Sequence, residues 1–137
     1  MRRALSILIL TLSGGIATAI GLAILLVPAT MFAGNAIVLN AGADLFSEAR
    51  APGALLITLG GFILLTVFRP KLRSAGLSVS AAVYLSYGMG RLLSLYVDGH
   101  PGDALIQAMA IELCLGAAAA MELVFPRGQY RKQGESA

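Results

Sequence analysis

Long apolar stretches follow one another along the chain, separated by shorter polar segments. The first apolar stretch covers residues 5–27 and ends before Pro28. A helix of that length measures about 34 Å, enough to cross a hydrocarbon core of about 30 Å. Three further stretches cover residues 52–68, 74–97 and 104–125. We therefore predict four transmembrane helices.

Each stretch is predicted to be helical because a spanning segment must satisfy its backbone hydrogen bonds within lipid, and the alternation typical of strands is absent. The second stretch is short for a span, so its helix is open to an earlier start. Asp44 is a candidate cap, with Pro52 either in the first turn or at a kink. The predicted fold class is all-α, an integral membrane four-helix bundle in which residues 1–137 form one domain.

The first stretch has two interpretations. Arg2 and Arg3 precede it, and Ala17-Thr18-Ala19 is similar to the cleavage site of a secretory signal peptide. The apolar residues continue beyond that site, however, through Leu22 to Leu26. A signal peptide has a shorter apolar core followed by polar mature chain, so we favour an uncleaved first helix.

Composition and charge support a membrane protein and predict its orientation. The chain is 58% hydrophobic and 12% charged, where soluble proteins average about 25% charged residues. Eight of the ten Lys and Arg residues fall at the N-terminus, between the second and third stretches, and at the C-terminus. The positive-inside rule therefore predicts that both termini are cytoplasmic. These eight residues are Arg2, Arg3, Arg69, Lys71, Arg73, Arg127, Arg131 and Lys132.

Several kinds of site are not indicated by the sequence. The net charge of +3 comes from basic clusters at the ends of apolar stretches, not from a basic and aromatic surface, so we expect no nucleic acid partner. With one histidine (His100) and one cysteine (Cys114), the chain lacks a nitrogen and sulfur ligand set, and we expect neither a metal nor a cofactor. The serines have no base beside them, so no catalytic residue is assigned.

Two charged residues fall deep inside the predicted spans, where a charge costs roughly 2.5–3.5 kcal/mol at the centre of the bilayer. Arg91 lies about 9 Å below the outer end of the third helix, and Glu112 lies about 12 Å below the outer end of the fourth. A short loop joins these helices into a hairpin. The two charges should meet at nearly the same depth and form an ion pair.

Other polar residues should gather around this pair. Tyr84, Tyr87 and Arg91 are spaced three and four apart and share one face of their helix. The predicted polar cluster lies in the outer half of the bundle, with Asp98 at its rim, and consists of Glu48, Arg50, Tyr87, Arg91 and Glu112. Two interpretations remain open: a structural lock in which the charges neutralise each other, or a cavity that binds a polar headgroup or small ligand.

Three other features bear on the architecture. The loop over residues 28–47 contains Phe32, Ile37 and Leu39 beside Asn35, Asn40 and Asp44, and we expect it to lie on or in the outer interface and cover the cluster. Glu122 is near the inner end of the fourth helix and is interpreted as structural. Small residues at helical spacing predict close packing of the helices, namely Gly14, Ala17, Gly21, Gly53, Gly60, Ala108, Gly116 and Ala119.

The chain resembles a known family through three motifs. They are the run from Ser47 to Gly53 (SEARAPG), the pattern Tyr84-x-x-Tyr87-Gly88-x-Gly90-Arg91, and Glu112. These resemble an uncharacterised bacterial membrane family, domain of unknown function 4345 (DUF4345), over nearly the whole chain. The resemblance implies a four-helix protein of the bacterial inner membrane and supplies no activity, substrate or cofactor. It also implies that Glu48, Arg50, Tyr87, Arg91 and Glu112 are the family's characteristic polar positions.

Three hypotheses for function follow from the sequence. The first is a protein that binds a lipid or other lipophilic small molecule at the polar cluster. The second is an accessory or scaffold subunit of a larger membrane complex, and the third is a membrane-embedded enzyme. The expected partners are membrane lipids and a lipophilic ligand, with a homo-oligomer or a larger complex left open. An open cavity beside Arg91 and Glu112 distinguishes the first hypothesis, because a bundle closed tightly around the pair would exclude it.

Overall fold

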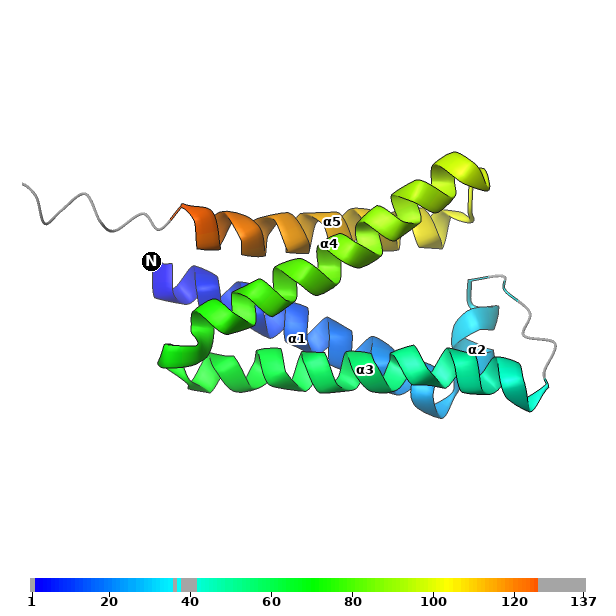
Figure 1. The fold of residues 1–137 in the computed structure, drawn as a ribbon, viewed down its shortest axis with the longest axis horizontal. Helices are drawn as coiled ribbons and strands as arrows, with labels where there is room; N and C mark the ends of the chain where they lie inside the picture. The colour runs from blue at the N-terminus through cyan, green and yellow to red at the C-terminus, as the bar shows by residue number, and fades with distance from the viewer. Residues whose placement is uncertain (1, 36, 38–41, 126–137) are drawn as a thin grey trace, which may run out of the picture.

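The computed structural model describes residues 2–35, 37 and 42–125, and within them the regular elements are all helical. The described residues form four long helices: α1 (Arg2–Leu26), α3 (Ala43–Phe68), α4 (Arg73–Val97) and α5 (Asp103–Val124). A short helix α2 (Pro28–Ala33) follows α1, and a 3-10 turn η1 (Pro70–Leu72) joins α3 to α4. The predicted all-α class is confirmed (Figure 1).

Helix α3 is longer than the apolar stretch that predicts it. It begins at Ala43, so the predicted range 52–68 covers only its C-terminal part, and Pro52 lies well inside the helix. Proline has no N–H, so the carbonyl of Glu48 lacks its usual helical donor there. Asp44 lies in the first turn and makes no capping hydrogen bond, because Gly42 occupies the N-cap position. Its carboxylate acts instead as a negative charge at the positive end of the helix dipole.

Proline and glycine mark where three of the long helices end. Val27 and Arg69 each precede a proline and leave the helical conformation, which ends α1 at Leu26 and α3 at Phe68. Helix α4 ends at Val97, and Gly99 then adopts a positive φ of 96°. A side chain would strain this left-handed conformation, which commonly closes a helix at its C-terminal end.

The long helices associate as two pairs, α1 with α3 and α4 with α5. Glycines bring the backbones together within each pair. A Cβ atom on Gly60 would lie 2.5 Å from Thr18 Oγ1 and 2.7 Å from Thr18 N, and a Cβ atom on Gly21 would lie 2.7 Å from the carbonyl oxygen of Gly53. In the α4–α5 pair, a Cβ atom on Gly116 would lie 2.8 Å from Leu85 Cγ. The close packing predicted for these glycines is confirmed.

The two pairs meet over only part of their length. One buried cluster includes Leu10, Ile63, Leu77 and Ala119 and joins all four long helices, towards the end where η1 lies. A second, smaller cluster contains Ala17, Leu56 and Tyr84. Beyond it, α4 diverges from α1 and α3, and the α4–α5 pair separates from the α1–α3 pair (Figure 1). This divergence leaves space at the end of the molecule that carries α2.

Three helices are long and apolar enough to cross a membrane: α1 from Arg3, α3 and α5. Many of their large side chains are exposed, including Leu8, Leu55 and Phe68, as expected of helices that face lipid. Helix α4 has a similar length but carries Ser, Gly and Tyr at many positions, and it is not among these three.

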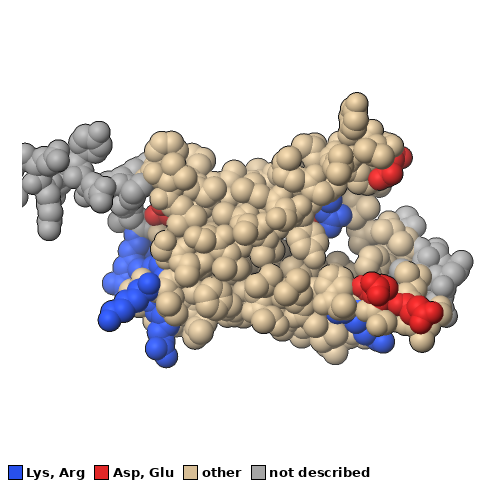
Figure 2. All heavy atoms as spheres, in the orientation of Figure 1, with Lys and Arg blue, Asp and Glu red and all other residues tan. Residues whose placement is uncertain are grey.

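Charged side chains are separated along the molecule. Figure 2 shows basic side chains gathered at the end where α1 begins and α3 ends, and most acidic side chains near the opposite end. Arg3, Arg69, Lys71 and Arg73 belong to the first end, in α1 and around η1. Other residues named in the sequence analysis lie outside the described residues, namely Leu39, Asn40, Arg127, Arg131 and Lys132.

Candidate functional site

A cavity of about 430 Å³ occupies the space between the two helix pairs. All five α-helices contribute to its wall, and most of that wall is apolar. In Figure 2 an opening passes between the end of the α4–α5 pair and the region of α2, with a basic side chain at its edge. The apolar lining residues include Ile16, Ile20 and Ile24 of α1, Leu56 of α3, Val83 of α4, and Leu105 and Ile111 of α5.

An ion pair lies in the wall of this cavity. Arg91 Nε donates to Glu112 Oε2 at 2.9 Å, joining α4 to α5 as the sequence predicts. The Glu112 side chain is 12% exposed and that of Arg91 is 34% exposed. A guanidinium carries five N–H donors, and the contact with Glu112 uses only the one on Nε. Within the described residues Arg91 makes no other hydrogen bond, so its two terminal amino groups remain available to a molecule in the cavity.

Two tyrosines of α4 line the cavity in different ways. Tyr84 is 5% exposed, and its hydroxyl donates to the backbone carbonyl of Ser13 at 2.5 Å, which ties α4 to α1. Tyr87 lies one turn further along α4, next to Arg91, and its hydroxyl bonds to no group among the described residues. Tyr84 therefore has a structural contact, while Tyr87 presents a polar atom to the space.

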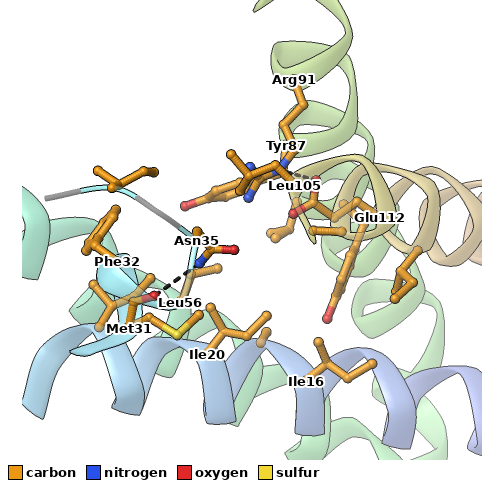
Figure 3. Close-up of a pocket in the computed structure, with 17 residues that line it drawn as sticks. Ile16, Ile20, Met31, Phe32, Asn35, Leu56, Tyr87, Arg91, Leu105 and Glu112 are labelled. Carbon is orange, nitrogen blue, oxygen red and sulfur yellow. Dashed lines mark hydrogen bonds and ion pairs between the residues drawn. The ribbon is translucent and has the colours of Figure 1, made fainter. Parts of the chain in front are cut away.

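The segment that contains α2 forms the opposite side of the cavity. Figure 3 shows Phe32 and Asn35 across from Tyr87 and Arg91. Met31, Phe32, Asn35 and Ile37 all belong to the lining, so this part of the predicted covering loop does face the polar residues. Asn35 Nδ2 donates to the carbonyl of Met31 at 3.1 Å, which leaves its amide oxygen as a further acceptor towards the cavity.

The structure brings three of the five predicted site residues together: Tyr87, Arg91 and Glu112. Glu48 and Arg50 lie outside the cavity lining. Arg50 is exposed, donates from Nε to the carbonyl of Leu25 at 3.2 Å, and places its guanidinium carbon 5.5 Å from the centre of the Phe46 ring. Because α3 starts at Ala43, this part of the helix extends alongside the end of α1 and holds Arg50 against it.

The remaining polar residues singled out in the sequence have local roles in the structure. Asp98 accepts a hydrogen bond from Ser94 Oγ at 2.8 Å at the end of α4 and does not line the cavity. Glu122 accepts one from Ser6 Oγ at 2.8 Å, which joins α5 to α1 at the opposite end from the cavity. His100 and Cys114 are exposed and also lie outside the lining. Within the described residues, no group of three acidic, His or Cys side chains could hold a metal ion.

Sequence reasoning did not select Tyr84, Asn35 or the apolar wall as parts of the site. The position of Tyr84 could have been recognised, since it lies three residues before Tyr87 on the helix face that the two tyrosines share with Arg91. Asn35 lies in a loop whose path the sequence does not define. In the sequence, the isoleucines of α1 cannot be distinguished from residues that face lipid. They form a cavity wall only because the two helix pairs diverge.

The described part of the chain is helical, with three helices long and apolar enough to cross a membrane. Residues 5–124 match the family described as Domain of unknown function (DUF4345), and the protein belongs to that family. No curated protein and no solved structure shows a significant match to the chain.

Proposed function

We propose that this protein crosses the bacterial inner membrane four times and binds a lipid or other lipophilic small molecule in the cavity between its helix pairs. The observation that carries the proposal is the cavity itself, whose wall includes the Arg91–Glu112 pair. If the pair were only a structural lock, the helices would be expected to pack closely around the two charges. A space of about 430 Å³ beside them favours a ligand.

The lining has the chemistry of a small-molecule site. Such sites usually measure about 300–1,000 Å³ and combine apolar walls with a few converging polar groups. Here all five α-helices contribute apolar residues to the wall, and the polar groups are Asn35, Tyr87, Arg91 and Glu112. A lipophilic tail would contact the isoleucines of α1 while its polar head meets the polar groups.

Location and topology are part of the same proposal. Three helices have the length and composition of membrane spans, and α4 connects two of them over a comparable length. Two of its polar side chains have their hydrogen bonds satisfied within the protein, as a membrane requires: Tyr84 donates to the carbonyl of Ser13, and Ser78 Oγ donates to the carbonyl of Ser74. The basic end marked by Arg3, Lys71 and Arg73 would face the cytoplasm, which puts both termini there and the cavity in the outer half of the bilayer.

A cavity-filling pair of variants tests the proposal. Ala108 lines the cavity, whereas Ala110 is exposed on the same helix. Native mass spectrometry of wild type, Ala108→Leu and Ala110→Leu, each extracted in mild detergent, compares the bound non-protein mass. We expect wild type and Ala110→Leu to retain a lipophilic molecule and Ala108→Leu to lose it.

Either of two results would overturn the binding proposal. The proposal is contradicted if the wild-type protein carries no small molecule after extraction and binds none that is added. A stoichiometric protein partner that remains attached in all three samples, with no bound small molecule, would favour the accessory-subunit hypothesis instead.

A further inference from the structure

The charge balance of the cavity constrains what it can hold. Arg91 and Glu112 are the charged residues of the lining, and their charges cancel. A carboxylate or phosphate that approached Arg91 would have to share it with Glu112, and the site would then carry a net negative charge. Most of the wall is apolar, and an uncompensated charge there is costly because little water or opposite charge stabilises it.

The unused hydrogen-bonding groups point to a particular kind of neutral head. The contact between Arg91 Nε and Glu112 Oε2 leaves the terminal amino groups of Arg91 as donors and Glu112 Oε1 as an acceptor. The amide oxygen of Asn35 is a second acceptor, and the Tyr87 hydroxyl both donates and accepts. A hydroxyl group satisfies this mixture, since it accepts from Arg91 and donates to a carboxylate or amide oxygen.

We infer that the ligand is a neutral, hydroxyl-bearing lipophile, such as a long-chain alcohol, and not an anionic lipid or fatty acid. The inference rests on the proposed function and specifies its ligand class. The Arg91–Glu112 pair then selects by charge: Glu112 compensates Arg91 in the empty site and thereby excludes a competing anion.

The test compares probes that share one alkyl chain, so that the apolar contribution to binding is the same for each. Tritiated dodecanol and dodecanoate are bound to the protein in phosphatidylcholine nanodiscs, at a pH at which the fatty acid is ionised. We expect wild type to bind dodecanol at least about tenfold more tightly, since a like charge next to Glu112 opposes the acid. Dodecyl methyl ether, which cannot donate, should compete less well than dodecanol.

A charge-removing variant and its matched control isolate the mechanism. Glu112→Gln leaves Arg91 uncompensated, so the preference should reverse and dodecanoate should bind more tightly than dodecanol. Glu122→Gln makes the same change on the same helix, away from the cavity, and should keep the wild-type preference. Comparing the ratio of the two affinities between variants cancels the different partition of the two probes into lipid, because that partition is the same for every variant.

The outcomes separate this inference from the proposed function. Saturable binding with a preference for dodecanoate in wild type overturns the neutral-ligand inference and keeps the binding function. An unchanged ratio in Glu112→Gln also overturns it. If that variant does not fold, Arg91→Gln provides the converse test: it leaves Glu112 uncompensated and should gain affinity for dodecylamine, and no gain contradicts the inference. Failure of wild type to bind any probe saturably sinks the binding function together with the inference.

Discussion

Arg91 and Glu112 form their ion pair in the wall of a cavity, with Arg91 Nε 2.9 Å from Glu112 Oε2. The pair joins α4 to α5 and also faces the space between the two helix pairs. The structural lock and the ligand site that the sequence left as alternatives are therefore compatible in one arrangement. Because Arg91 uses one of its donors on Glu112, it can hold the hairpin together and still contact a ligand.

The energetic coupling of this pair is the first prediction. Arg91→Gln and Glu112→Gln should each destabilise the protein by about 1–3 kcal/mol, because each leaves a partly buried charged group without its hydrogen-bond partner. The double variant should be less destabilised than the sum of the single variants, by about 1 kcal/mol. Reversible unfolding in mixed micelles measures the cycle. Additive effects would show that the two side chains do not interact.

Neighbouring glycines of α3 should respond differently to the same substitution. Gly60→Ala puts a Cβ atom against the backbone and side chain of Thr18 and should cost about 1–3 kcal/mol. Gly61 has open space at its Cβ position, so Gly61→Ala should be neutral or stabilise the helix by up to about 1 kcal/mol. Thermal unfolding of both variants checks the prediction, and equal effects would contradict the packing of α1 on α3.

Removing the two tyrosine hydroxyls should separate stability from binding. Tyr84→Phe loses a buried hydrogen bond to the Ser13 carbonyl and should lower the free energy of unfolding by about 0.5–1.5 kcal/mol. Tyr87→Phe removes a hydroxyl that has no partner among the described residues, so stability should hold while ligand affinity falls. Unfolding and dodecanol binding are measured on both variants. Loss of stability in Tyr87→Phe, with affinity intact, would reverse these roles.

The orientation in the membrane gives a further prediction. In a Cys114→Ser background, His100→Cys places a thiol in the exposed α4–α5 loop, and Lys71→Cys places one in the exposed turn η1. A membrane-impermeant maleimide added to intact spheroplasts should label the first variant, and should label the second only after permeabilisation. The opposite pattern would invert the topology, and labelling of both sites from outside would mean that α4 does not span.

The helices and the ion pair were within reach of sequence reasoning because each rests on a strong local signal. Long apolar runs predict helices, and prolines and glycines near their ends limit them, as at Pro28, Pro70 and Gly99. The hairpin loop sets the relative depth of Arg91 and Glu112, so their contact follows from counting residues. Glycine spacing likewise predicted where α1 and α3 approach closely.

The shape of the site was not predictable in the same way. The divergence of α4 from α1 and α3 depends on how all the side chains pack together, and the periodicity of apolar residues in the sequence does not predict it. Glu48 and Arg50 were grouped with the pair because they share its outer level, but depth says nothing of direction around the bundle. The early start of α3 places Arg50 against the carbonyl of Leu25. The apolar residues of the cavity wall could not be distinguished from lipid-facing residues, because the sequence does not show which way they face around the bundle.

Photolabelling tests the central claim, a ligand cavity between the helix pairs, most directly. A diazirine-bearing fatty alcohol and the matching fatty acid are each crosslinked to the protein in nanodiscs, and the labelled residues are mapped by mass spectrometry. We expect the label from at least one probe to concentrate on lining residues such as Ile20 and Leu105, to be displaced by unlabelled probe, and to decrease in Ala108→Leu. Label from both probes that spreads over exposed residues such as Leu8 and Phe68, without saturation or competition, would contradict a binding cavity.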